Sequence, residues 1–209
     1  MLFGGADGSE LELRDARGKS RTIRGKFPYG RLAVLSDGGK NGRPRKEQFA
    51  PQAFAYRIDK TDEDLHLLAG HSYDRPLASR SADTFDVKDT PEAVVFTAEI
   101  TPEMMEVSWV LDLLRMFAAG LIGGISPGFR IPPPSAVAAS DAEKVSEEDP
   151  AQGRALIRTI FQALLYELSL VTVPAYKETQ VEARSWDVTP GGVVVPDAGL
   201  RLAQKRWRA

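Results

Sequence analysis

The sequence of 209 residues contains no cysteine. A disulfide scaffold, a thiol nucleophile and a cysteine-based zinc site are therefore excluded together. The sequence has 27 Lys and Arg residues and 29 Asp and Glu residues, so neither sign of charge dominates. This balance does not favour a nucleic-acid binder, so we expect no nucleic-acid partner.

Long apolar runs are also missing. The longest candidate, residues 107–125, is interrupted by Asp112, Arg115 and several glycines, whereas a membrane span needs roughly 18 uninterrupted apolar residues. The first residues lack a basic stretch followed by an apolar one. We therefore expect neither a signal peptide nor a membrane span.

Hydrophobic residues make up 43% of the chain, which is typical of one globular domain. We expect this domain over residues 21–184, between a flexible N-terminus (1–20) and a flexible C-terminal tail (185–209). Residues 132–153 contain five acidic residues, one lysine and little apolar surface to bury. They are predicted to be a disordered insertion.

The elements predicted inside this domain are mostly strands. Thr101, Pro102 and Gly120 are placed to cap, begin and stop a helix over 102–119. A second, short helix is expected over 51–60. Periodicity and turn residues predict strands over 21–37 (two, joined by a turn), 65–70, 84–87, 93–100, 121–131 and 154–173. The fold class is therefore α+β.

Ser126 lies in the pattern G-x-S-x-G, formed by residues 124–128. The best-known meaning of this pattern is the nucleophile elbow of α/β-hydrolases, where the acid and then the histidine follow the serine. Here both histidines precede it, and the next residue, Pro127, lacks the N–H that would serve the oxyanion. Both features argue against that fold, and we expect the glycines to leave room for a substrate backbone.

A serine hydroxyl needs a nearby base, and the sequence has two histidines. His71 follows a predicted strand and begins an exposed loop, whereas His66 lies within that strand. Five positions separate them, which on a strand places them on opposite faces. Each residue also has a structural interpretation, since histidines at strand ends and serines among glycines are common in turns.

Glu167 lies in an apolar run, residues 164–171. A carboxylate is costly to bury there unless it is paired, and orienting an imidazole would provide the pairing. The alternatives are an exposed face beside Ser169 or an arginine partner.

Taken together and in order, these motifs resemble the prohead proteases of tailed phages over roughly residues 22–183. The resemblance rests on Arg45-Lys46-Glu47, Phe49, Pro51, Ala53-Phe54, residues 67–71, Pro76-Leu77, Arg80, residues 124–129, residues 167–171 and Pro174-Ala175.

The resemblance implies a β-barrel wrapped by a few helices, like the herpesvirus capsid-maturation protease. It further implies a serine endopeptidase with His71 and Ser126 as catalytic residues and Glu167 as the third member. Asp74 and Glu47 are the alternatives for the third place. No metal or cofactor is implied.

The substrates implied are the major capsid protein, the scaffold and the protease itself, cleaved inside the immature prohead in the cytoplasm of the bacterial host. A homo-oligomer is compatible with this reading. The rival reading is a non-enzymatic capsid-assembly or scaffold-interaction protein that retains the fold. The test between them is whether the side chains of His71 and Ser126 converge from neighbouring strands.

Overall fold

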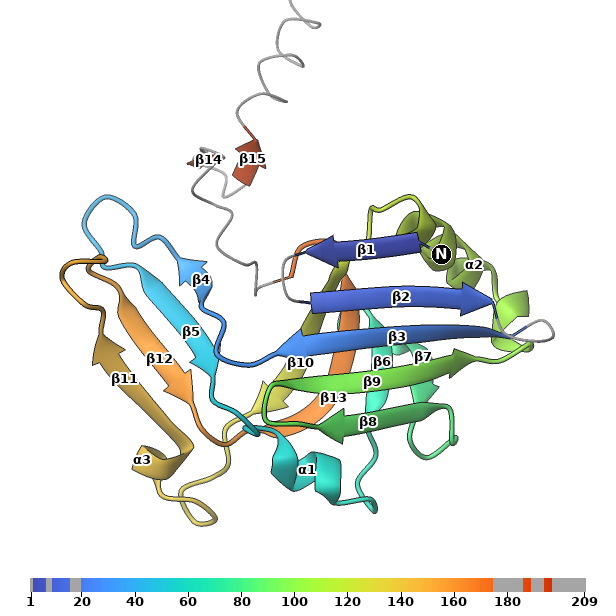
Figure 1. Cartoon of the computed structure of the whole chain (residues 1–209), viewed down its shortest axis with the longest axis horizontal. Helices are drawn as coiled ribbons and strands as arrows, with labels where there is room; N and C mark the ends of the chain where they lie inside the picture. Colours follow the sequence, from blue (N-terminus) through green and yellow to red (C-terminus); the bar gives the residue numbers. More distant parts are fainter. Residues whose placement is uncertain (1, 7–8, 16–19, 175–185, 189–193, 197–209) are drawn as a thin grey trace, which may run out of the picture. The chain divides into compact units, whose positions relative to one another are not determined.

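The computed structural model describes residues 2–6, 9–15, 20–174, 186–188 and 194–196. The chain divides into two compact units, residues 1–177 and 178–209. In the second unit, β14 (Trp186–Val188) pairs with β15 (Val194–Pro196) in an antiparallel ribbon. The rest of the predicted flexible tail lies outside the described residues. All other elements belong to the first unit (Figure 1).

The first sheet is antiparallel, with the strand order β1-β2-β3-β9-β8. Its strands are β1 (Leu2–Ala6), β2 (Ser9–Asp15), β3 (Arg21–Pro28), β8 (Phe85–Asp89) and β9 (Ala93–Ile100). The predicted hairpin over 84–100 is thus confirmed. The described part of residues 1–20, expected to be flexible, instead forms β1 and β2. Leu11 and Leu13 alternate with charged residues, and Leu11 is buried in the core.

The second sheet has the order β10-β13-β6-β7. Its strands are β6 (His66–Ala69), β7 (Ser72–Ser79), β10 (Gly124–Arg130) and β13 (Leu164–Val171). In Figure 1 these strands run behind the first sheet. A Cβ atom at Gly25 in β3 would lie 2.3 Å from the Phe96 ring and 2.9 Å from Ile125 Cδ1. The core therefore lies between these two sheets, and Ile125 points into it.

The third sheet has the order β11-β12-β5-β4. Its strands are β4 (Ala33–Ser36), β5 (Arg45–Phe49), β11 (Glu143–Glu147) and β12 (Leu156–Ile160). The predicted strand over 154–173 is thus two strands, β12 and β13, in different sheets.

The prediction that residues 132–153 are disordered is wrong. They contain α3 (Ala139–Ala142) and β11, which pairs with β12. Three of the five acidic side chains are paired with cations from elsewhere in the chain, which offsets part of the cost of ordering a polar segment. The pairs are Glu143 with Arg158, Glu147 with Arg43 and Glu148 with Lys46.

The described strands are divided among separate sheets, so they do not form the expected closed barrel. The edge strands of the second sheet, β10 and β7, contain Pro127 and Pro76 respectively. Proline lacks the N–H that a further strand would need as a donor, so these edges are poorly suited to closing a ring. The fold is α+β, mostly sheet with short helices.

The two expected helices are present, but both are shorter than predicted, and the predicted start of the longer one at Pro102 is wrong. Helix α1 covers Ala55–Asp59, and α2 covers Ser108–Ala118 after a 3₁₀ turn, η1 (Met104–Glu106). The N–H of Met104 donates to Thr101 Oγ1, but the N-cap residue is Glu103 for the 3₁₀ turn and Val107 for α2, so the predicted cap at Thr101 is wrong. Val107 is extended and separates that turn from α2, and Gly120 ends the segment with a φ of +72°. In the described ranges, no helix is long and apolar enough to cross a membrane.

Candidate active site

His71 lies in a tight turn between β6 and β7. Ala69 pairs with Ser72, so the two turn residues are Gly70 and His71, each with a φ of 62°. A two-residue hairpin turn with positive φ at both positions is type I′. Glycine adopts this conformation freely, whereas it is uncommon for histidine. Such strain persists only where surrounding contacts compensate for it.

Those contacts come from β13. The backbone N–H of His71 donates to Ser169 Oγ at 2.9 Å, and Gly70 N–H donates to the carbonyl of Leu170 at 3.0 Å. The ring atom Nδ1 of His71 is 2.6 Å from Glu167 Oε1. The side chain of His71 is 45% exposed, so the ring is fixed on one side and open to solvent on the other.

Glu167 is 4% exposed, and both of its oxygens have partners. Oε1 faces His71, while Oε2 accepts a hydrogen bond from Ser169 Oγ at 2.7 Å. These partners satisfy a carboxylate that would otherwise be costly to bury. The exposed-face and arginine-partner alternatives for Glu167 are excluded by this burial and these contacts.

Ser126 is opposite Ser169 in the antiparallel pair of β10 and β13, and Gly128 is opposite Glu167. Residues directly opposite each other in such a pair share a face of the sheet. Ser126 therefore lies on the same face as Glu167 and Ser169, and it is only 9% exposed.

Two glycines of the motif around Ser126 pack closely against other parts of the protein. A Cβ atom at Gly128 would lie 2.0 Å from Glu167 Oε1, and one at Gly124 would lie 2.5 Å from Pro174 Cδ. The two outer glycines of the motif thus make room for other parts of the protein. The expectation that the glycines leave room for a substrate backbone stays a prediction, and at Gly123 a Cβ atom would meet nothing within 4 Å.

The expected placement of His71 and Ser126 on neighbouring strands is wrong, because β13 lies between β10 and β6. In the described part of the chain, no hydrogen bond joins the His71 ring to the Ser126 hydroxyl. Strands separated by one other strand are about 10 Å apart. The imidazole contacts Glu167 Oε1 on β13, and the same oxygen lies against Gly128 in β10, the strand that carries Ser126.

An open cleft of about 760 Å³ borders His71. Its lining includes the turn and the start of β7, with Asp74 and Arg75, together with Leu113 of α2 and Val173. Asp74, an alternative third member, therefore borders the same cleft.

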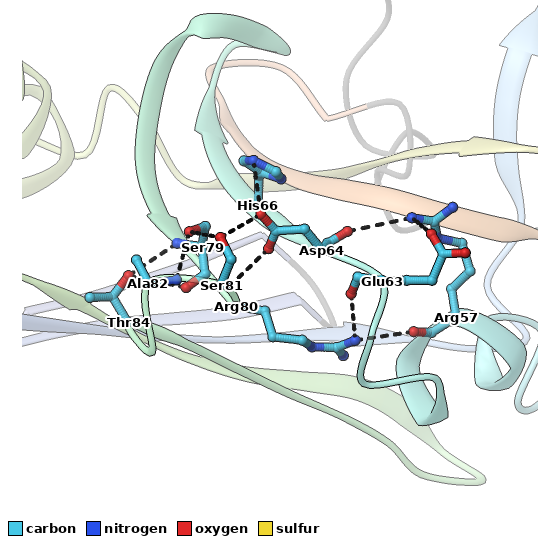
Figure 2. Close-up of polar contacts among 9 residues, drawn as sticks. All are labelled: Arg57, Glu63, Asp64, His66, Ser79, Arg80, Ser81, Ala82 and Thr84. Carbon is cyan, nitrogen blue, oxygen red and sulfur yellow. Dashed lines mark hydrogen bonds and ion pairs between the residues drawn. The ribbon is translucent and has the colours of Figure 1, made fainter.

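His66 lies opposite Glu167 in the parallel pair of β6 and β13. It is thus on the same face as Glu167, and the prediction of opposite faces for the two histidines is wrong. Strand alternation stops at Ala69, because Gly70 and His71 form a turn. Figure 2 shows His66 beside Asp64, with His66 Nε2 3.5 Å from Asp64 Oδ2.

The remaining polar groups near His66 connect loops to each other (Figure 2). Asp64 accepts hydrogen bonds from the N–H and the hydroxyl of Ser81. These bonds hold the pKa of Asp64 below its ordinary value, although burial acts in the opposite direction more strongly than any one of them. The Arg80 guanidinium donates to main-chain carbonyls at the end of α1 and after it, which are those of Arg57, Ile58, Lys60 and Glu63.

The structure also places Glu47 and Tyr73. Glu47, the other alternative third member, is paired with Arg158 at 2.8 Å and lies in β5 of the third sheet, whereas His71 lies between two strands of the second sheet. Tyr73 follows the turn and lies edge-on to the His66 ring, with centroids 5.7 Å apart. Burial, and then the negative charge of Glu167, raise the pKa of Tyr73.

Sequence reasoning missed Ser169 and the packing role of Gly128. A signal for Ser169 was present, because it follows Glu167 by two positions and so shares its face of the strand. No comparable signal existed for Gly128, because its contact depends on strand pairing. Among the described residues, no group of three or more His, Asp or Glu side chains could bind a metal ion.

The fold presents a buried serine, a buried carboxylate and a partly exposed histidine on one face of a sheet, as a serine hydrolase would require. A family model described as caudovirus prohead serine protease matches residues 33–191. The chain belongs to this family, and the matched range includes His71, Ser126 and Glu167. No curated protein and no solved structure matches the chain in the corresponding searches.

Proposed function

We propose that this protein is a serine endopeptidase that cleaves the major capsid protein and the scaffold during prohead maturation. The observation that carries the proposal is the 2.6 Å contact between His71 Nδ1 and Glu167 Oε1, on the sheet face that also bears Ser126. Membership of the prohead protease family supports the substrates and a location inside the immature prohead, in the host cytoplasm.

The proposed roles of the residues follow from which nitrogen of the His71 ring faces Glu167. With Nδ1 of His71 directed at the Glu167 carboxylate, Nε2 is available to accept the proton of the Ser126 hydroxyl. The serine oxygen attacks the scissile carbonyl, and the imidazolium then protonates the leaving amine. Glu167 stabilises the imidazolium and fixes the tautomer. Contacts between nucleophile and base commonly tighten only when substrate binds, which accommodates the missing bond between Ser126 and His71.

The direct test is co-expression with the major capsid protein proposed as the substrate, followed by intact-mass measurement of both chains. The wild type is expected to shorten the capsid protein at discrete sites, while Ser126→Ala leaves it intact. Ser20→Ala is a matched control, because Ser20 is also buried but immediately precedes β3, a strand of the first sheet. Equal cleavage by the wild type and Ser126→Ala would contradict the proposal.

The same measurement addresses the remaining parts of the proposal. Self-cleavage would shorten the wild-type protease but not Ser126→Ala. An assembly protein without enzymatic activity would leave every chain at full mass while still binding the capsid protein. A relationship to the herpesvirus protease stays a proposal based on the sequence resemblance alone.

A further inference from the structure

Ser169 is a fully buried polar residue at the centre of β13, with 0% of its surface exposed. Its hydroxyl accepts a hydrogen bond from the backbone N–H of His71 at 2.9 Å. The same hydroxyl donates to Glu167 Oε2 at 2.7 Å. A single side chain therefore contacts both the backbone of the histidine and the carboxylate that the histidine ring faces.

The bond to the His71 backbone helps to determine the turn conformation. His71 has a positive φ, which is unfavourable for a residue with a side chain, so this conformation requires compensating contacts. The neighbouring N–H, that of Gly70, pairs with the main-chain carbonyl of Leu170. The N–H of His71 instead depends on a side chain, so a mutation at position 169 can remove its acceptor without altering the strand.

The bond to Glu167 determines the orientation of the carboxylate. Oε2 is occupied by the Ser169 hydroxyl, which leaves Oε1 directed at the imidazole. A hydrogen bond donated to a carboxylate also favours its ionised form. An ionised, fixed carboxylate is what a catalytic imidazolium requires as a partner.

We propose that Ser169 is a positioning residue of the active site, which aligns the His71 ring by bonding both its backbone and its carboxylate partner. The inference rests on the proposed protease function for its effect on catalysis. It also makes claims about hydrogen bonding that can be tested without any activity. Ser169 itself contacts neither substrate nor the reacting atoms in this role.

The test compares Ser169→Ala, Ser169→Cys and Ser169→Thr with the wild type, and Ser20→Ala serves as the control. Alanine removes both bonds, cysteine preserves the volume with a much weaker donor and acceptor, and threonine retains the hydroxyl. Cysteine also covers the case in which alanine fails to fold. Thermal unfolding of each variant separates loss of the fold from loss of alignment.

The first readout is amide hydrogen exchange by NMR in the inactive Ser126→Ala background. In Ser169→Ala and Ser169→Cys the His71 amide is expected to exchange at least tenfold faster, while the Gly70 amide remains protected. The His71 Nδ1–H resonance, shifted downfield by the carboxylate, is expected to broaden or disappear in the same variants. Unchanged exchange and an unchanged resonance would overturn the proposal, even if the wild type proved to have no protease activity.

The second readout is cleavage kinetics. Small misplacement of a catalytic group costs about 100-fold in rate, so we expect kcat to fall about 10- to 100-fold in Ser169→Ala and Ser169→Cys at unchanged KM. Threonine is expected to restore most of kcat. A fall in stability with kcat preserved would show that Ser169 only fills space, which would also overturn the proposal.

Discussion

Glu167 and Gly128 face each other across β13 and β10, so closely that a Cβ atom at position 128 would lie 2.0 Å from Glu167 Oε1. The carboxylate thus occupies the space that any other residue at 128 would fill. The need for a glycine at position 128 links the serine motif to Glu167, the acid that contacts His71, although Gly128 and Glu167 lie 39 positions apart.

The first prediction concerns that glycine. Gly128→Ala is expected to displace the Glu167 carboxylate, lower the free energy of unfolding by about 1–3 kcal/mol through overpacking, and reduce capsid-protein cleavage at least 100-fold. Chemical denaturation and cleavage kinetics measure the two effects. Gly123→Ala is the matched control, because a Cβ atom there meets nothing within 4 Å. Equal effects at both positions would contradict the packing explanation.

The second prediction concerns the charge of Glu167. Glu167→Gln keeps the shape but removes the negative charge that stabilises the imidazolium, and a comparable change in another serine protease costs about 10⁴ in kcat. The double variant with Ser126→Ala is expected to be little worse than Ser126→Ala alone, since such residues act as a unit. Near-normal turnover in Glu167→Gln would transfer the role to Asp74, which borders the same cleft, or leave a serine–histidine pair.

The third prediction separates the two histidines. His71→Ala is expected to abolish cleavage, whereas His66→Ala retains most of it, because His66 faces Asp64 and the Tyr73 ring. Both variants are compared by cleavage of the capsid protein under the same conditions. His66 lies on the same sheet face as Glu167, so it is an alternative to His71 as the base, and this experiment distinguishes the two histidines. Loss of activity in His66→Ala alone would identify His66 as the base.

The fourth prediction concerns stability against pH. Asp89 accepts a hydrogen bond from the Tyr29 hydroxyl at 2.8 Å, and within the described residues its Oδ2 is buried without a partner. Burial raises the pKa of Asp89 from 3.8 to about 6. The native state therefore retains a proton that the unfolded chain releases at lower pH. The contribution of Asp89 to stability declines as pH rises from about 4 to above 6.

Asp89→Asn is expected to remove this decline and to raise the free energy of unfolding at pH 7 by about 1–2 kcal/mol. One pKa unit corresponds to about 1.4 kcal/mol, and the range allows for screening of a partly exposed group. Urea unfolding between pH 4 and pH 8 measures the slope. Asp86→Asn controls for net charge, because Asp86 is exposed in the same strand. An equal slope in the wild type and Asp89→Asn would show that Asp89 ionises normally in the folded protein.

Local patterns were sufficient to predict several elements and to single out His71, Ser126 and Glu167 as candidates. The hairpin over 84–100 and the stop at Gly120 depend on neighbouring residues, so the sequence contains the whole signal. The predicted cap at Thr101 does not mark the start of α2, which follows Val107. The motifs around His71, Ser126 and Glu167 were recognisable because they too depend on neighbouring residues. The family match over residues 33–191 confirms the resemblance on which their assignment rests.

Strand pairing could not be predicted in this way. The run 154–173 reads as one β-prone segment, but only the tertiary structure assigns β12 and β13 to different sheets and places β13 between the strands of Ser126 and His71. The acidic stretch 132–153 appeared unable to fold, because its cationic partners, Arg43, Lys46 and Arg158, are distant in sequence or lie in another element. The residue types were therefore sufficient to suggest the chemistry. Their convergence depends on register and strand order, which arise from hydrogen bonds between segments about 40 to 100 positions apart.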